Sequence, residues 1–327
     1  MRILFIIDPL ENLSQKWDNS LALARWMLRR GHECWTADVP DIWSTEKSVH
    51  ADARPLALSS NARPAYLDLL QGPQAVLNLM ALDLVIVRKE PPFDLNYYYL
   101  TLFLDRIKHT VAVSNDPAGI RKTNEKLGVF CVPKRAPRSL VTCSPGRILQ
   151  FQRETGKPVV LKPLNEKGGK GVRLLKPHPK LAVRLSRWTG GGTKMMIVQE
   201  RIRERGHRGD KRILLLEGRL LTAYRKHPPR GDFRSNLSIG GTSSETSITG
   251  SERSLIRELR PYLLREGLHL AGLDVMGGKL LDLNVTCPAG MTEAETLCPG
   301  FIAAEAWGFF LERRVKRRRR TLPNSRP

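Results

Sequence analysis

Hydrophobic and polar residues alternate with two different periods along the first part of the chain. The apolar run RILFIID (2–8) is short and bounded by polar residues, which is typical of a buried parallel strand. The next segment, 19–32, repeats its apolar residues with helical spacing, so we expect a helix with Asn19 or Ser20 as its N-cap and Gly31 as its stop. The chain therefore begins as a strand followed by a helix.

The same alternation continues to about residue 120. We expect further strands over 33–39, 82–89 and 110–115, a helix over 95–108, and a polar loop with several prolines before the third strand. Strands that alternate with helices predict a doubly wound α/β sheet in residues 1–122. No GxGxxG follows the first strand, which argues against a nicotinamide site there.

From about residue 125 the pattern changes to short strands joined by glycine-containing turns. We expect strands over 157–163, 171–177 and 195–200 and a helix over 179–189. Together these elements predict a small α+β lid over residues 123–200.

Two hairpins and two helices are expected in the C-terminal part. The hairpins cover 211–227, with a turn at Glu217 and Gly218, and 270–285, with a turn at Gly277 and Gly278. The helices cover 251–267 and a segment from about 301 onward. We therefore expect an α+β domain over 201–314, followed by a disordered basic tail over 315–327, where arginines are frequent.

The segment VVLKPLNEKGGKGV has the composition of a phosphate-binding loop. It places Lys162 at the end of an apolar strand and follows it with Gly168, Gly169 and Lys170. Backbone N–H groups of a glycine loop can approach phosphate oxygens closely, and lysines neutralise their charge. Taken alone, such a segment is usually only a hairpin, so the assignment depends on its neighbours.

A carboxylate follows the next apolar strand. In MMIVQERI, Glu200 stands at the strand end, where it could accept hydrogen bonds from a ribose or an adenine amine, and main-chain groups near Ile202 could contact the adenine edge. An exposed Glu at a strand end is common. The ligand interpretation gains its weight from the lysines upstream.

Three oxygen donors lie within the apolar strands of the last hairpin. Asp274, Asp282 and Asn284 suit Mg²⁺, and burying them without partners would cost free energy. Asp282 and Asn284 share one face of a strand. Asp274 joins them only if the loop holds an odd number of residues, because a strict two-residue turn pairs it with Leu281. The metal interpretation therefore predicts Asp274 opposite Asp282, and the alternative is a set of outward polar residues on an edge hairpin.

Four arginines stand at strand ends or in loops beside these segments. They are Arg88, Arg212, Arg225 and Arg234. Guanidinium groups bind carboxylates and phosphates with two hydrogen bonds, which suits substrate binding. In so basic a chain, a surface charge is the safer interpretation of any single arginine, and it is their position beside the other motifs that selects these four.

Composition narrows the chemistry further. The chain has 327 residues, of which 41% are hydrophobic and 26% charged, enough for two or three compact units. Its five cysteines form no CxxC pair and its histidines no HExxH spacing, so a disulfide framework or a zinc site is not indicated and a reducing cytoplasm fits best. No stretch approaches the roughly 18 apolar residues of a membrane helix.

The formal net charge of +22 predicts attraction to anions. Nucleic acid, nucleotides, acidic peptides and anionic membrane surfaces all qualify, and charge alone does not choose among them. We rank a solvated basic surface above a dedicated nucleic-acid groove.

Taken in order, eight segments resemble the successive motifs of the bacterial glutathione synthetases of the ATP-grasp superfamily. The segments are IDPLENLSQKWDNS, VRKEPPFD, NEKLGV, VVLKPLNEKGGKG, VQERI, GDKRILLLEG, NLSIGG and GLDVMGGKLLDLNVTCP. The resemblance implies an ATP-grasp fold with an N-terminal α/β domain, a central lid and a C-terminal domain. ATP would lie between the last two domains.

The same resemblance implies a role for each motif residue. Lys126 and Lys162 would contact ATP phosphates, and Gly168 and Gly169 would belong to a mobile loop over the nucleotide. Glu200 and Ile202 would hold ribose and adenine. The ligands of Mg²⁺, with Mn²⁺ as a substitute, would be Asp274, Asp282 and Asn284. Arg212, Arg225 and Arg234 would be catalytic, with the offset at Arg225 left open, and Arg88 and Asn236 would face the substrates.

The implied reaction joins γ-glutamylcysteine to glycine. The γ-phosphoryl group of ATP is transferred to the peptide carboxylate, and the amine then attacks the acyl phosphate and releases phosphate. Such chemistry needs positioning and charge neutralisation rather than a covalent nucleophile. The resemblance also implies a cytoplasmic homo-oligomer that acts on small molecules, away from membranes.

Three differences from the family pattern leave two alternatives open. The family has Glu where this chain has Asp282, it reads Ser-Pro-Thr where this chain reads Cys287-Pro288-Ala289, and the region from Arg225 to Arg234 is one residue longer here. One alternative is an ATP-grasp ligase for another carboxylate and amine. The other is a basic ATP-binding homologue with little turnover that acts through nucleic acid or a protein partner.

Overall fold

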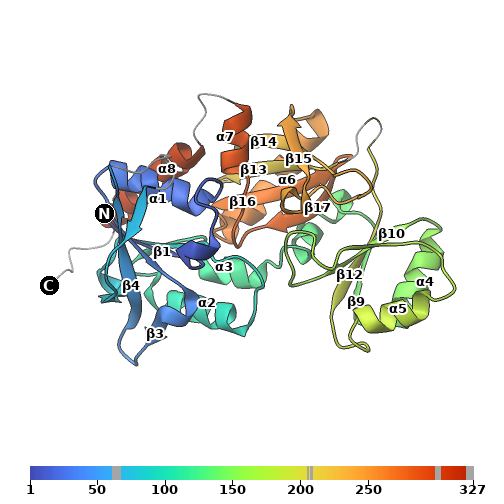
Figure 1. Cartoon of the computed structure of the whole chain (residues 1–327), viewed down its shortest axis with the longest axis horizontal. Coiled ribbons are helices and arrows are strands. Elements are labelled where there is room, and N and C mark those ends of the chain that lie inside the picture. Colours follow the sequence, from blue (N-terminus) through green and yellow to red (C-terminus); the bar gives the residue numbers. More distant parts are fainter. Residues whose placement is uncertain (61–67, 205, 207–208, 299–302, 322–327) are drawn as a thin grey trace.

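Three β-sheets follow one another along the chain (Figure 1). The computed structural model describes residues 1–60, 68–204, 206, 209–298 and 303–321. No helix formed by these residues is long and apolar enough to cross a membrane.

The N-terminal sheet is built on four parallel strands in the order β2-β1-β7-β8. They are β1 (Arg2–Ile6), β2 (Glu33–Ala37), β7 (Leu84–Val87) and β8 (Ala112–Ser114). Alternate residues of β1 point to opposite faces. Phe5 packs in one cluster with Leu21 of α1 (Asn19–Arg29), and Leu4 packs in another with Leu100 of α2 (Leu95–Ile107). Helices therefore cover both faces, which confirms the doubly wound α/β prediction.

The expected loop before β7 instead contains four strands. They are β3 (Ile42–Ser44), β4 (Val49–Leu58), β5 (Leu69–Gln71) and β6 (Ala75–Asn78), and β4 pairs antiparallel with β2 and with the other three. The buried positions of β4 include Ala51 and Ala53. These side chains are small and Pro55 interrupts the segment, so the strand pattern is weak in the sequence.

The N-cap of α1 is Asp18, so the prediction of Asn19 or Ser20 was wrong. One carboxylate oxygen of Asp18 accepts hydrogen bonds from Ser20 N (2.7 Å) and Leu21 N (3.0 Å). Asn19 is buried and accepts bonds from the backbone N–H groups that begin α7 (Met291–Leu297). It therefore ties the N-terminal domain to the C-terminal part of the chain.

The central sheet is antiparallel, in the order β11-β10-β12-β9. Its strands are β9 (Ser139–Thr142), β10 (Val159–Pro163), β11 (Arg173–Leu175) and β12 (Met196–Glu200). Two helices pack on it, α4 (Pro145–Thr155) and the predicted α5 (Leu181–Trp188), through a separate core that includes Ile148, Leu161 and Leu185.

The C-terminal sheet has the order β15-β14-β13-β16-β17. Its strands are β13 (Lys211–Leu216), β14 (Arg219–His227), β15 (Thr242–Glu245), β16 (Leu270–Met276) and β17 (Lys279–Asn284), with α6 (Gly250–Arg265) beside them. Both predicted hairpins are present. Glu217 and Gly218 have φ of 55° and 64°, the left-handed values that a tight two-residue turn needs.

Shorter helices connect these units. They are α3 (Pro117–Lys122) and the 3₁₀ helices η1 (Leu10–Asn12), η2 (Val39–Asp41), η4 (Leu79–Ala81), η5 (Leu127–Cys131), η6 (Pro133–Arg135) and η7 (Leu237–Ile239).

The predicted tail is in large part a helix. α8 covers Ala303–Thr321, so the expectation of disorder from residue 315 was wrong as far as 321, and residues 322–327 lie outside the described part. Val315 is buried, and the Arg319 guanidinium lies 2.6 Å from Asp83. These contacts join the helix to the N-terminal domain, a tertiary effect that a run of arginines conceals.

Asn115 joins the first and third sheets. Its Nδ2 donates to Leu270 O (2.8 Å) and Val285 O (2.9 Å), and its Oδ1 accepts from Leu270 N (2.9 Å). Because the side chain is buried, all three backbone groups depend on it for partners.

We predict that Asn115→Ala lowers the free energy of unfolding by about 2–4 kcal/mol, since it leaves buried backbone groups without partners. Urea denaturation measures this change. Asn96→Ala, at an exposed position of α2, is the control and should change stability by less than about 0.5 kcal/mol. Equal stability of the two variants would contradict the role of Asn115.

Candidate active site

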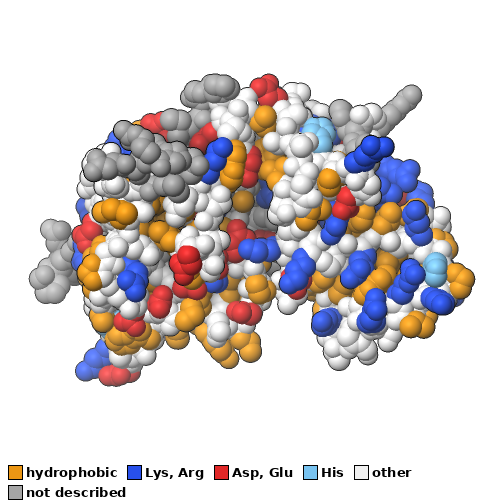
Figure 2. Space-filling view, viewed as in Figure 1, with side chains coloured by type: hydrophobic (Ala, Val, Ile, Leu, Met, Phe, Trp, Pro, Cys, Tyr) orange, Lys and Arg blue, Asp and Glu red, His pale blue; other side chains and the backbone are white. Residues whose placement is uncertain are grey.

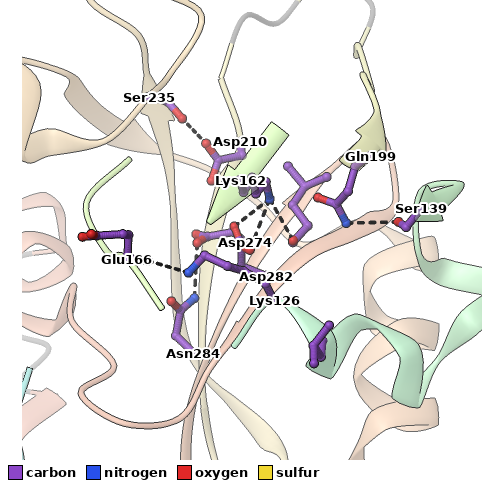
Figure 3. A network of polar contacts seen from close by, with 12 residues as sticks. Lys126, Ser139, Lys162, Glu166, Gln199, Asp210, Ser235, Asp274, Asp282 and Asn284 are labelled. Atoms are coloured by element: carbon purple, nitrogen blue, oxygen red, sulfur yellow. Dashed lines mark hydrogen bonds and ion pairs between the residues drawn. The ribbon is translucent and has the colours of Figure 1, made fainter. Parts of the chain in front are cut away.

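A cavity of about 480 Å³ lies between the central and C-terminal sheets. Twelve of the predicted site residues line it: Lys126, Lys162, Gly168, Gly169, Glu200, Ile202, Arg212, Arg234, Asn236, Asp274, Asp282 and Asn284. Figure 3 shows several of them converging from both sheets. Arg88 and Arg225 are not among the lining residues.

The hairpin of β16 and β17 places its acidic residues side by side. Asp274 pairs with Asp282 in the strand register, as predicted. The turn holds only Gly277 and Gly278, however, so the odd number of residues expected in the loop was wrong. The additional residue is Leu281, which forms a bulge within β17 and restores the register.

Asp274 is the centre of a buried ionic network. Lys226 Nζ lies 2.8 Å from Asp274 and 2.7 Å from Asp210, and Arg212 Nε lies 3.2 Å from Asp274. Burial alone would raise the pKa of Asp274, but the charges of Arg212 and Lys226 outweigh it and hold that pKa well below its usual value. The carboxylate is therefore ionised at neutral pH.

Asp282 has a different cation as its partner. Lys162 Nζ, from β10 in the central sheet, lies 3.0 Å from Asp282 and donates to Leu281 O (3.1 Å). This ion pair connects the lid to the C-terminal sheet across the cavity (Figure 3).

The donor set suits a hard cation only in part. Asp274, Asp282 and Asn284 offer two carboxylates and an amide, and Asn284 Nδ2 lies 3.2 Å from Asp274. The described residues include no group of three or more His, Cys, Asp or Glu side chains that could hold a metal ion. Mg²⁺ uses few protein oxygens and takes its other ligands from water and phosphate, so the set fits Mg²⁺ beside a phosphate ligand.

The glycine loop between β10 and β11 forms part of the cavity lining. Gly168 and Gly169 have φ of 61° and 77°, a conformation that other residues adopt at a cost. Lys126 Nζ donates to Glu166 O (2.6 Å), and Arg234 donates to Gly169 O (3.1 Å). The loop is therefore held by cations from both of its sides.

Glu200 also lines the cavity. It ends β12, is partly exposed, and pairs with Lys157 at 3.0 Å. Ile202 follows it in the lining, together with Val160 and Met276. Apolar side chains beside a carboxylate suit a planar base attached to a ribose.

Arg225 and Arg88 lie outside the cavity. Arg225 donates to Glu204 (3.0 Å) and to Gly209 O (3.1 Å), and the next residue of β14, Lys226, faces the cavity in its place. Arg88 is buried at the end of β7, where its Nε donates to Ser20 (3.2 Å) and its Nη1 finds no partner among the described residues.

Comparisons with known proteins agree with this geometry. The family model for the prokaryotic glutathione synthetase N-terminal domain matches residues 1–121, and the model for that family's ATP-grasp domain matches residues 125–298. The chain belongs to the prokaryotic glutathione synthetase family. The glutathione synthetases of Gloeobacter violaceus and Nitrosomonas europaea are 35% and 36% identical to it, over 91% and 90% of this chain and 92% of each relative.

Solved structures show the ATP-grasp fold at lower identity. The D-cycloserine synthetase DcsG has a TM-score of 0.65 at 14% identity, covering 94% of this chain and 99% of its own. The ATP-grasp ligase PsnB complexed with minimal precursor has a TM-score of 0.62 at 17% identity, covering 95% and 98%. The fold prediction is confirmed, and no substrate follows from these neighbours.

Asp210, Lys226 and Glu125 line the cavity but were not among the predicted site residues. Asp210 and Lys226 belong to the ionic network. Glu125 is partly exposed and accepts a hydrogen bond from Thr286 (2.7 Å), and its pKa is raised chiefly by desolvation of the carboxylate. The sequence signal for Lys226 was its place directly after the predicted Arg225. Only the strand register shows which of the two side chains faces the cavity.

We predict that Asp274→Asn lowers the free energy of unfolding by about 3 kcal/mol at pH 7, because it removes the ion-pair partner of Arg212 and one of the two partners of Lys226. The folded pKa of Asp274 is depressed, so its stabilisation is complete above about pH 4 and is lost as pH falls towards the folded pKa. The difference between wild type and variant should therefore shrink in acid.

Urea denaturation across pH measures this difference, with Glu46→Gln at an exposed position as the control. A difference that stays constant from pH 7 to pH 3 would contradict the assignment.

Proposed function

We propose that this protein is a glutathione synthetase that uses ATP to join the carboxylate of γ-glutamylcysteine to the amine of glycine. The observation that carries the proposal is the convergence of twelve motif residues on one cavity in a chain of this family. The cavity combines a glycine loop, lysines and paired carboxylates, a set that suits a nucleotide with its metal.

The nucleotide lies with its phosphates towards the lysines. Lys126 and Lys162 neutralise phosphate charge, Gly168 and Gly169 cover the phosphates, and Glu200 with Ile202 holds the ribose and adenine. Asp274, Asp282 and Asn284 hold Mg²⁺, for which Mn²⁺ can substitute. When bound, the metal neutralises phosphate charge and so favours transfer of the γ-phosphoryl group.

The reaction proceeds through an acyl phosphate. A carboxylate oxygen of γ-glutamylcysteine attacks the γ-phosphorus and ADP leaves, after which the glycine amine attacks the acyl carbon, loses a proton and displaces phosphate. Arg212 and Lys226 supply fixed positive charge where phosphate oxygens gather, and Arg234 with Asn236 positions the substrate and the loop. The closed glycine loop excludes water.

Arg88 is assigned to a substrate carboxylate. Its guanidinium is buried, and Nη1 has no hydrogen-bond partner among the described residues. A bidentate carboxylate supplies such partners. Nearby Cys287 has its pKa raised well above the usual value, chiefly by burial, so it stays a neutral thiol and contributes shape rather than charge.

A ligase for another carboxylate and amine is the second candidate. Cys287 is buried in the loop that the family resemblance assigns to the amine acceptor, and Ala289 follows two residues later. A different acceptor would fit a loop of changed shape. We place either activity in the cytoplasm, since every cysteine is a free thiol, and infer a homo-oligomer from the family resemblance alone.

We expect phosphate release to require ATP, Mg²⁺, γ-glutamylcysteine and glycine together, with glutathione detected by mass. EDTA should abolish the release, and added Mg²⁺ or Mn²⁺ should restore it. Release with γ-glutamylcysteine and an amine other than glycine would favour the second candidate. ATP binding without any turnover would contradict both candidates.

We predict that Lys226→Met lowers kcat by at least about 100-fold, as expected when one preorganised charge at a reacting phosphate is removed. Lys226→Arg keeps the charge and should retain more activity. Arg225→Lys is the control, because Arg225 itself does not line the cavity, and it should change kcat by less than about fivefold. Thermal melting verifies that each variant is folded.

If Arg225→Lys lowered kcat as far as Lys226→Met, the assignment of the charge to Lys226 would be wrong. A rise in KM for ATP at unchanged kcat would make Lys226 a binding residue only.

A further inference from the structure

A second hollow, of about 750 Å³, lies beside the C-terminal sheet. It is separate from the cavity described above and shares no lining residue with it. We call it the α8 groove, because it is bounded by α8, the β13–β14 turn and α6. Six arginines line it: Arg219, Arg260, Arg313, Arg314, Arg317 and Arg318.

The positive charge of the α8 groove is poorly compensated. Of the described residues that line it, Glu217 is the one carboxylate, and this residue is hydrogen-bonded to His269. The side chains of Arg219 and Arg313 form no ion pair or hydrogen bond within the described part of the chain. Guanidinium groups cannot relieve mutual repulsion by losing protons, so counter-anions must do so.

Arg314 adds a buried donor to this set. Its Nε is inaccessible to solvent and has no hydrogen-bond partner among the described residues. Burial, together with the charge of Arg318, lowers the pKa of Arg314 although Glu217 raises it. An anion in the groove would stabilise this side chain.

The spacing of the arginines favours a chain of anions. Arg313 and Arg317 are one helical turn apart, and so are Arg314 and Arg318, which corresponds to about 6 Å along α8. Each guanidinium can bind a phosphate with two hydrogen bonds. A single small anion would reach only part of this row, whereas consecutive phosphates would follow it.

Apolar side chains lie among these cations. Leu220 is 43% exposed, and Phe310 lines the groove while contacting His269. Single-stranded nucleic acid is bound by grooves in which cations follow the backbone and apolar or aromatic side chains contact the bases. A recessed groove admits a flexible strand more readily than a flat bilayer surface.

We propose that the α8 groove binds a segment of single-stranded nucleic acid, with its arginines on the phosphates and Phe310 and Leu220 against the bases. This site is separate from the ligase cavity and does not depend on the proposed reaction. Part of the high net charge would then serve binding at this groove, which composition alone did not indicate.

The test is fluorescence anisotropy of a labelled 12-nucleotide oligothymidine with the full chain. The variant Arg219→Gln/Arg313→Gln removes two exposed cations from the groove. Lys176→Gln/Arg184→Gln removes the same charge from exposed positions of the central domain, a region whose visible face is also rich in Lys and Arg (Figure 2).

We expect the groove variant to weaken binding about tenfold, and to reduce the slope of log affinity against log salt by about 1.4, the loss of two phosphate contacts on a single strand. The central-domain variant should weaken binding less than about twofold. Ligase turnover should be unchanged in both variants, which verifies folding.

Equal losses in the two variants would overturn the proposal, since binding would then follow net charge. Absence of oligonucleotide binding by the wild type would also overturn it. If in that case the wild type bound vesicles with 30% anionic lipid and the groove variant did not, the groove would be a site for anionic lipid instead.

Discussion

The buried carboxylate of Asp274 is the interaction on which the site depends. A charge at the centre of a β-sheet is costly unless it is paired, and here the partners come from strands on one side of β16: Arg212 from β13 and Lys226 from β14. The strand order and the register of β13 with β16 bring these charges together, and the bulge at Leu281 places Asp282 opposite Asp274. The same arrangement leaves two cations close to the proposed phosphate position.

The contacts between domains also converge on this cavity. Lys162 reaches Asp282 from the lid, and Lys167 of the glycine loop lies 2.8 Å from Glu90 in the N-terminal domain. By contrast, Asn115 joins the first and third sheets through buried hydrogen bonds. The lid is thus tied to its neighbours by ion pairs that phosphate and metal would compete for, so ligand binding and lid position are coupled in the proposed cycle.

The sequence predicted the parts of this molecule whose pattern is strong. The buried strand 2–8 and the two glycine turns of the C-terminal hairpins have clear sequence patterns. Twelve of the residues predicted from the family motifs line one cavity. The strand at 49–58 was missed because alanine carries its buried positions. The sequence did not show that Lys226 rather than Arg225 lines the cavity, because a one-residue shift reverses the face of a strand and only strand pairing determines that shift. Likewise, the helix beyond residue 315 depends on tertiary contacts.

The most direct test of the proposed site is a crystal structure of the protein with a non-hydrolysable ATP analogue and Mg²⁺. We predict phosphates between Lys126 and Lys162, with the metal on Asp274, Asp282 and Asn284 and the Lys226 ammonium within hydrogen-bonding distance of a phosphate oxygen. A nucleotide bound elsewhere, or a cavity in which Arg225 rather than Lys226 contacts the phosphates, would contradict it.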